Sequence, residues 1–186
     1  MSDVVVMKFG GTSVATAEAR HRAALKVISA RERGAWPVVV VSAIGRRGAP
    51  YATDTLVQML REVDPDTEPD AREMDLLVST GEILSAVIFA QTLKSLGHSA
   101  SVFRGGQAGI RTDGVYGNAR VLGVNPTSLF RCLEGGKIPV VCGFQGVFSP
   151  VPGMPGGELT TLGRGGSDTT ASAVGAAMRA RAVEIY

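Results

Sequence analysis

The sequence has 186 residues, of which 45% are hydrophobic and 19% charged, and its formal net charge is +2. This is the composition of a folded globular domain, and a chain of this length buries about 70% of the surface that its unfolded form exposes. The small net charge, the lack of a basic stripe and the single tryptophan argue against a nucleic-acid partner and favour a small anionic ligand.

Short β-branched segments alternate with longer helical segments along the chain. The expected strands are 4–7, 38–42, 100–103, 120–124, 138–142 and 183–186, and the expected helices are 16–30, 53–63, 72–96, 125–135 and 167–179. Residues 104–119 are predicted to be irregular or a hairpin, and residues 143–166 to be a glycine- and proline-rich loop. The alternation predicts one domain with a mostly parallel sheet and helices on both faces, a fold in which ligands bind beyond the carboxyl ends of the strands.

The sequence contains neither a signal-peptide pattern nor, by inspection, a run of about 20 apolar residues that would span a membrane. Cys132 and Cys142 lie in apolar contexts that are typical of reduced core thiols. We therefore expect a cytoplasmic protein without a membrane partner.

The first candidate site follows the first strand. Its residues are Lys8, Phe9, Gly10, Gly11, Thr12 and Ser13. Glycines between a strand and a helix leave amide groups that can face a phosphate, and the adjacent lysine can bind a transferring phosphoryl group. A tight turn with a surface lysine explains the same residues, and their spacing matches neither the P-loop nor the dinucleotide-binding fingerprint.

A second glycine-rich segment, TTLGRGGSD over residues 160–168, leads into the last expected helix. The planar guanidinium of Arg164 suits a carboxylate or a phosphate. The alternative is an ordinary helix start with Ser167 or Asp168 as the N-cap. Two anion-binding loops in one chain are more informative than either alone.

Ser79-Thr80-Gly81-Glu82 precedes an apolar helical stretch and can be read in two ways. The local pattern is a capping box, Ser-x-x-Glu, which would start a helix at this point. The functional reading places the acid of Glu82 where it can hold a substrate ammonium group.

Ser42, at a strand end, and Thr53, at a helix start, are further candidates for binding substrate oxygens. His21 and His98 fit no catalytic triad and no metal-ligand spacing.

Together these segments resemble the aspartate kinases of the amino-acid kinase superfamily. The matching stretches are KFGGTSV, VVVVSA, STGEILSA, GFQGV and TTLGRGGSDTTA, in the family's order and over most of the chain. The resemblance implies a three-layer αβα sandwich that is incomplete at its C-terminus. It also implies transfer of the ATP γ-phosphoryl group to the side-chain carboxylate of L-aspartate, giving 4-phospho-L-aspartate for lysine, threonine and methionine synthesis. A carboxylate is already nucleophilic at pH 7, so positioning and charge neutralisation suffice.

The resemblance also implies a role for each matching residue. Lys8 would neutralise the phosphoryl group, the amides of Gly10 and Gly11 would cradle its oxygens, and Asp168 would organise Lys8 and the Mg-nucleotide region. Arg164 would bind a carboxylate of aspartate, and Glu82 its ammonium. The implied substrate shell is completed by Ser42, Thr53, Phe144, Gly165, Gly166 and Ser167. Mg²⁺ would arrive with ATP rather than on a direct protein ligand.

Members of this family continue past the strand that begins VEIY into a TDVDG-like nucleotide loop and then into ACT regulatory domains. We therefore expect residues 1–186 to be one partial catalytic domain without an ACT domain, and the full-length protein to be a homo-oligomer. Two alternatives stay open: a related kinase for acetylglutamate, glutamate or UMP, and a non-catalytic aspartate-binding domain. The combination of Glu82 with Arg164 argues against the other acceptors.

Overall fold

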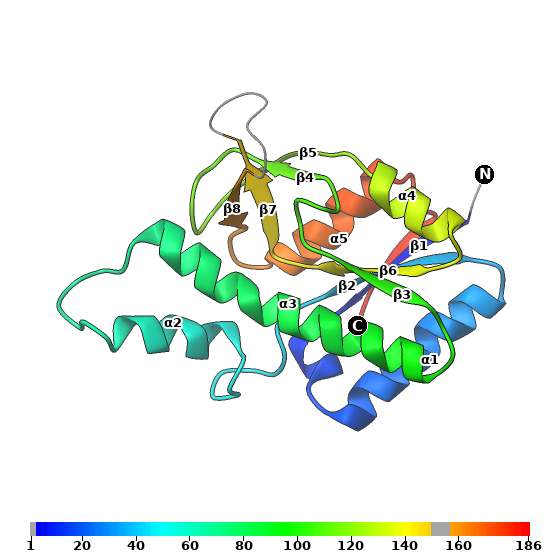
Figure 1. Cartoon of the computed structure of the whole chain (residues 1–186), viewed down its shortest axis with the longest axis horizontal. Helices are drawn as coiled ribbons and strands as arrows, with labels where there is room; N and C mark the ends of the chain where they lie inside the picture. The colour runs from blue at the N-terminus through cyan, green and yellow to red at the C-terminus, as the bar shows by residue number, and fades with distance from the viewer. Residues whose placement is uncertain (1–2, 150–156) are drawn as a thin grey trace.

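The computed structural model describes residues 3–149 and 157–186, and its centre is a five-stranded sheet (Figure 1). The sheet order is β3-β6-β2-β1-β9, and every pairing in it is parallel. The strands are β1 (Val4–Phe9), β2 (Trp36–Val41), β3 (Ala100–Phe103), β6 (Ile138–Cys142) and β9 (Ala182–Ile185). Parallel strands are buried on both faces, which explains the continuous valine runs of β1 and β2.

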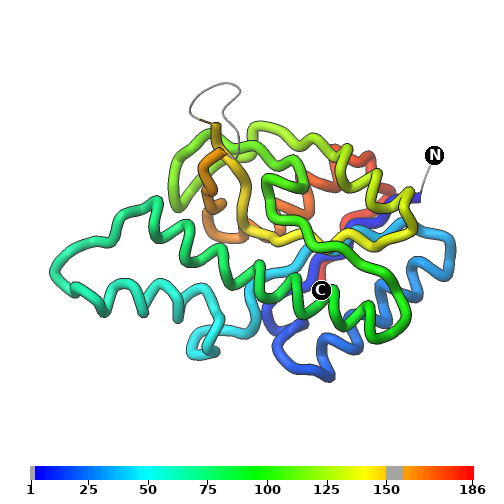
Figure 2. Tube along the Cα trace, in the orientation of Figure 1, coloured from blue at the N-terminus to red at the C-terminus, as the bar shows by residue number. Residues whose placement is uncertain are grey.

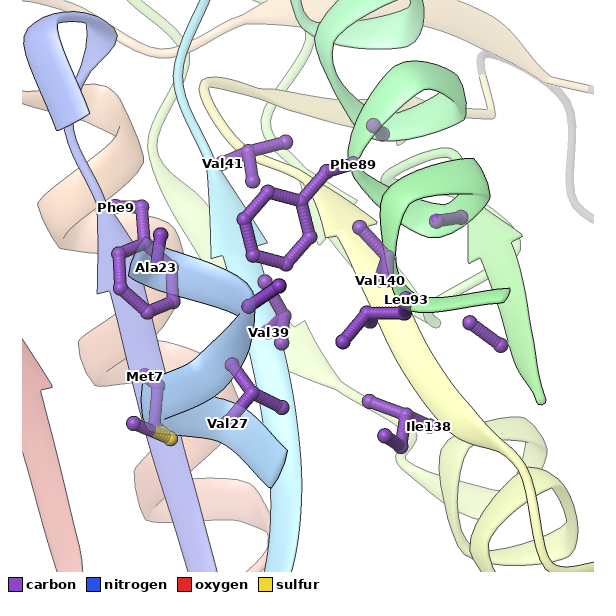
Figure 3. Packing of buried hydrophobic residues seen from close by; sticks show 14 of the residues in the cluster. Met7, Phe9, Ala23, Val27, Val39, Val41, Phe89, Leu93, Ile138 and Val140 are labelled. Carbon is purple, nitrogen blue, oxygen red and sulfur yellow. The ribbon is translucent and has the colours of Figure 1, made fainter. Parts of the chain in front are cut away.

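Helices cover both faces of this sheet. They are α1 (Ala17–Glu32), α3 (Ala71–Ser95), α4 (Thr127–Glu134) and α5 (Gly166–Ala177). A further helix, α2 (Thr53–Arg61), packs against α3, and a short 3₁₀ helix, η1, lies at Gly11–Val14. One core joins Met7 and Phe9 of β1 to α1 and α3, where Phe89 packs (Figure 3). The other joins Val4 and Val6 to α4 and α5. The predicted three-layer αβα sandwich is therefore confirmed.

A second, smaller sheet was not predicted. Its order is β5-β4-β7-β8, with β4 at Ile110–Thr112, β5 at Val121–Val124, β7 at Gln145–Phe148 and β8 at Glu158–Thr161. The expectation of a loop throughout residues 143–166 is thus wrong. These strands are three or four residues long and rich in glycine and polar residues, so their stability comes from pairing with distant segments rather than from local pattern.

Asp75 connects helix α3 to this second sheet. Its carboxylate is 1% exposed and accepts hydrogen bonds from the Thr161 amide at 2.7 Å and the Thr161 hydroxyl at 2.5 Å. It also accepts from the Gly117 amide at 2.9 Å. Buried carboxylates persist when donors satisfy their oxygens, so this contact fixes the strand end that leads toward residues 163–168.

Helix α3 begins well before the predicted capping box. Its N-cap is Asp70, whose side chain accepts from the amides of Arg72 and Glu73. Ser79 lies inside the helix, where its hydroxyl donates to the Leu76 carbonyl at 2.8 Å. The capping-box interpretation is therefore wrong, because the helix begins at Ala71, more than two turns upstream of Ser79.

By length and composition alone, α3 could cross a membrane, contrary to the expectation that the sequence has no such run. In the structure, half of its most apolar window is buried within the protein. It packs against α1 and against strands of both sheets, as the core helix of a globular domain does.

Helix α2 and the connection that leads from it to α3 project from the rest of the molecule as an arm (Figures 1 and 2). The two helices pack against each other, and residues 42–52 connect β2 to the base of this arm. The arm therefore lies beside the carboxyl ends of β1 and β2.

Candidate functional site

A pocket of about 280 Å³ lies at the carboxyl ends of the central strands, where the fold predicts a ligand. The predicted residues that line it are Lys8, Gly11, Ser42, Thr53, Glu82, Phe144, Gly165, Gly166, Ser167 and Asp168. These residues come from both glycine-rich segments, from helix α3, from the start of α2 and from the segments that follow β2 and β6. The structure thus brings together most of the predicted site.

Lys8 and Asp168 form an ion pair inside this pocket. The Lys8 Nζ atom lies 2.7 Å from the Asp168 Oδ1 atom, and the side chains are 11% and 53% exposed, respectively. Lys8 belongs to β1 and Asp168 to the first turn of α5, which packs on β1. The lysine is thereby held at the start of a helix whose first amides have no intrahelical partner and carry positive potential. A phosphoryl group placed here would contact both the Lys8 ammonium group and the first amides of α5.

Glycine is required where α5 begins. Gly165 has φ 78°, a left-handed conformation that side chains rarely adopt. At Gly166, a Cβ atom would lie 2.6 Å from a ring carbon of Phe144. The two glycines therefore allow the chain to turn sharply and let the helix start approach the pocket closely.

Glu82 provides a buried acid in the lining of the pocket. The residue is 2% exposed, and its Oε1 atom accepts from the Ala43 amide at 3.0 Å. Its Oε2 atom is buried and has no hydrogen-bond partner within residues 3–149 and 157–186. Burial raises the pKa of the Glu82 carboxyl to about 8, against the smaller opposing effect of the Ala43 amide. Buried acids with perturbed pKa values in a cleft are typical of functional sites.

Phe144 contributes to the pocket through an unusual backbone. Its φ is 68°, a value that non-glycine residues seldom adopt. The conformation is held from both sides, because the Phe144 amide donates to the Thr170 hydroxyl at 3.0 Å and its carbonyl accepts from the Leu162 amide at 2.8 Å. Such enforced conformations concentrate at ligand sites.

The residues of the predicted phosphate loop, 8–13, lie in different environments in the structure. Strand β1 continues through Phe9, so Lys8 and Phe9 point to opposite faces of the sheet. Phe9 is 1% exposed and stacks between Phe89 and Tyr186. Its side chain is therefore part of the core and does not line the pocket.

Two further expectations for this loop are not met by the geometry. The Gly10 amide donates to the Tyr186 carbonyl at 2.9 Å and is not free to hold a phosphate oxygen. Thr12 and Ser13 line a separate hollow beside α1 rather than the pocket. Of the predicted segment, only Lys8 and Gly11 face the pocket.

Arg164 also lies apart from the other predicted substrate residues. It is exposed and lines a neighbouring hollow of about 700 Å³ against α2. Arg47 and Asp54 line both this hollow and the pocket, so the two spaces adjoin. Arg46 and Arg47 also line the pocket. They form a basic pair in the loop after the second strand, which fits a small anionic ligand, but they were not predicted as site residues.

The residues of the pocket fit a phosphate-bearing ligand. Lys8 and the first amides of α5 supply donors for phosphoryl oxygens. In the part of the chain that the structure describes, no group of three or more His, Cys, Asp and Glu side chains could hold a metal ion. A magnesium ion bound to nucleotide phosphates would require no such group, and its presence stays a prediction.

The chain is similar to known kinases over nearly all of its length. It is 44% identical over 183 residues to an aspartokinase from Geobacillus stearothermophilus, covering 98% of this chain and 42% of that protein. The structure of aspartate kinase from Synechocystis matches with a TM-score of 0.77 and 40% identity, covering 98% of this chain and 28% of that one. The E. coli aspartokinase III structure in complex with aspartate and ADP matches with a TM-score of 0.75 and 27% identity, covering 99% and 49%.

The chain thus spans about 42% of the length of the curated relatives that it matches. The sequence profile of the amino acid kinase family matches residues 3–186. The chain therefore belongs to the amino acid kinase family.

Proposed function

We propose that this chain carries the acceptor-binding and phosphoryl-transfer residues of an aspartate kinase. The reaction would move the γ-phosphoryl group of ATP to the side-chain carboxylate of L-aspartate, giving 4-phospho-L-aspartate. The observation that carries the proposal is a single pocket that joins the Lys8–Asp168 ion pair to the buried acid Glu82. The aspartokinase relatives at 42–45% identity support the same acceptor.

The proposed roles follow from the charges in the pocket. Lys8 neutralises charge that develops on the transferring phosphoryl group, and Asp168 holds the lysine in place. The amides at the start of α5 donate to phosphoryl oxygens. ATP would bring Mg²⁺, which neutralises the phosphates as it does in other phosphoryl transfers.

Glu82 distinguishes an amino-acid acceptor from an acid without a free amine. Its unpartnered Oε2 atom can accept from an ammonium group at the pocket wall. An ammonium also stabilises the ionised carboxylate, which burial alone disfavours. Ser42, Thr53 and Ser167 line the same pocket and offer hydroxyls to the acceptor carboxylates.

Isothermal titration of the chain with L-aspartate, L-glutamate, N-acetyl-L-glutamate and UMP tests the proposed acceptor. We expect L-aspartate to bind at least about tenfold more tightly than N-acetyl-L-glutamate, because acetylation removes the charge that Glu82 recognises. Preferred binding of N-acetyl-L-glutamate or UMP would reject the proposal. Binding of aspartate by a protein that never phosphorylates it would favour the non-catalytic alternative.

We also propose a cytoplasmic location, a homo-oligomeric full-length protein and a place in lysine, threonine and methionine biosynthesis. The buried free thiols of Cys132 and Cys142 are consistent with a reducing compartment. The product, an acyl phosphate, is a reactive intermediate that a later reductive or transfer step must consume.

A further inference from the structure

Gln145 is a polar side chain that is buried between β7 and α3. The residue is 1% exposed, and its Nε2 atom donates to the Ser79 carbonyl at 3.2 Å. Its Oε1 atom is also buried, and no atom of residues 3–149 and 157–186 donates a hydrogen bond to it. A buried acceptor without a donor lowers the free energy of unfolding, so stability does not account for an amide at this position.

The bond from Gln145 to Ser79 is one of two contacts that hold α3 against the second sheet. The other is made by Asp75, whose carboxylate accepts from the amide and the hydroxyl of Thr161. Gln145 and Thr161 lie opposite each other on β7 and β8. Asp75 and Ser79 are four residues apart on α3, and residues at this spacing lie on one face of a helix, about one turn apart. A cross-strand pair therefore holds two successive turns of the same helix face.

Glu82 follows on this face of α3. It lies three residues beyond Ser79, a spacing at which helical residues are neighbours. The Ala43 amide holds the Oε1 atom of Glu82 at 3.0 Å, from the side of the loop over residues 42–52. The Gln145 amide holds the helix backbone about one turn earlier, from the side of β7. The direction of the Glu82 carboxylate therefore depends on both contacts.

Gln145 is also adjacent to another residue of the pocket lining. It follows Phe144, which lines the pocket and has a left-handed backbone. The hydrogen bond from Gln145 therefore links the enforced turn at Phe144 to the helical turn before Glu82. We propose that Gln145 is a positioning residue that directs the acid of Glu82 toward the ammonium group of the acceptor. A displacement of about 1 Å is enough to impair a site of this kind. This inference rests on the proposed function and adds to it a residue outside the pocket lining.

Substitution by an apolar side chain of similar size separates this role from a structural one. Gln145→Met removes the unpartnered acceptor together with the donor. Ser79 lies inside α3, where its carbonyl keeps the intrahelical acceptor role. We therefore expect the free energy of unfolding of the ligand-free chain to stay the same or to rise. Affinity for L-aspartate should fall about fivefold, the effect of one lost neutral hydrogen bond. Gln145→Leu repeats the test with a second apolar side chain.

Succinate, which is L-aspartate without its ammonium group, shows whether the loss passes through Glu82. Both variants of Gln145 should bind succinate as wild type does, because this ligand does not use Glu82. NMR titration measures both affinities, since it covers dissociation constants in the millimolar range. The same question is answered without succinate in a Glu82→Gln background, where adding Gln145→Met should not lower the affinity for L-aspartate again.

Thr112→Val is the matched control in the same sheet. The Thr112 hydroxyl is buried and lies 2.6 Å from the Thr160 hydroxyl, so this variant also loses a buried hydrogen bond, but one between two strands. It should lower the free energy of unfolding, because the Thr160 hydroxyl loses its partner, and leave both affinities unchanged. This is the reverse of the pattern that we expect for Gln145→Met. An equal loss of L-aspartate affinity with Thr112→Val would show a general effect of loosening the sheet and would overturn the proposal.

The remaining outcomes separate this inference from the proposed function. If wild type binds L-aspartate and both variants of Gln145 bind it equally well, only the role of Gln145 is rejected. If the variants weaken L-aspartate and succinate by the same factor, or both lose most of their stability, Gln145 supports the fold in general and the proposal is overturned. If wild type does not bind L-aspartate at all, both proposals fail.

Discussion

The Nζ atom of Lys8, near the end of β1, lies 2.7 Å from the Oδ1 atom of Asp168, in the first turn of α5. The two residues are 160 positions apart in the printed sequence, so only the fold brings them together. Because the pair sits where a helix N-terminus meets the carboxyl end of a central strand, it marks the position for an anionic reacting group.

Replacing Lys8 should affect turnover more than binding. In the full-length protein, Lys8→Ala is expected to lower kcat by roughly 10²–10³-fold, the usual effect of removing a group that stabilises transition-state charge. The dissociation constant for L-aspartate should change much less. Steady-state kinetics and calorimetry measure the two quantities separately. Lys26→Ala is the control, because Lys26 lies over the Tyr186 ring and outside the pocket. An equal loss of affinity and turnover would contradict the transition-state role.

The carboxyl of Glu82 should make stability depend on pH in an identifiable window. Burial raises the pKa of this carboxyl from its ordinary value of 4.5 to about 8, so the folded chain holds this proton more tightly than the unfolded chain. Its contribution is complete below about pH 4.5 and is lost as the pH rises toward 8, by about 1.4 kcal/mol per pH unit within the window. Glu82→Gln cannot titrate and should lack this decline.

Urea unfolding of wild type and Glu82→Gln at pH 5, 6, 7 and 8 measures the difference. The free energies of unfolding should converge or cross in favour of the variant as the pH rises. Parallel curves would mean that Glu82 titrates normally in the folded protein. L-aspartate should protect the wild type most at pH 8, where the ionised carboxylate can meet the ammonium group.

Asp75 should contribute to the free energy of unfolding, and its loss should loosen mainly the segments that it contacts. Asp75→Asn replaces one of the two acceptor oxygens by an NH2 group, which places a donor against the donors of Gly117 and Thr161. We expect a loss of about 2–4 kcal/mol in the free energy of unfolding, as for a broken buried charged network. Amide hydrogen exchange at Gly117 and Thr161 should accelerate more than elsewhere. Asp66→Asn, on an exposed connection, is the control and should be neutral. If amide exchange in Asp75→Asn were faster by the same factor throughout the chain, Asp75 would have no specific role at Gly117 and Thr161.

Substituting Gly81 tests whether α3 tolerates a side chain where it contacts the loop of residues 42–52. Alanine is favoured over glycine inside a helix by about 1 kcal/mol, so Gly81→Ala alone would stabilise α3. The added Cβ would, however, lie 2.9 Å from the Ala43 Cβ and displace the 42–52 loop. We expect weaker aspartate binding and no gain in Tm. Thr80→Ala, at an exposed position on the same helix, should leave binding unchanged. A stabilised variant with normal affinity would show that the loop moves freely.

Local patterns predicted the central sheet because its strands are continuous apolar runs. The predicted strand 100–103 matches β3, and 138–142 matches β6. The second sheet could not be predicted in the same way, since Glu158–Thr161 is polar and is stabilised by pairing with Gln145–Phe148. The capping box failed for a related reason: Asp70, further upstream, already supplies the N-cap.

For the site, types of residue were easier to predict than directions of side chains. The sequence indicated that Lys8, Glu82 and Asp168 belong together, and the pocket brings all three to one place. It did not indicate that Phe9 would point into the core, because that depends on where β1 ends. Nor did it place the basic pair Arg46-Arg47 in the pocket, because the position of that pair depends on a loop that packs against distant glycines.

Product formation tests the central claim most directly. The chain, and a longer form extended to the length of its relatives, would be incubated with Mg-ATP and L-aspartate, and the acyl phosphate trapped with hydroxylamine. We expect aspartyl hydroxamate from the longer form and a loss of at least about a hundredfold in rate with Lys8→Ala. Phosphorylation of L-glutamate, N-acetyl-L-glutamate or UMP with no product from L-aspartate, or an undiminished rate with Lys8→Ala, would contradict it.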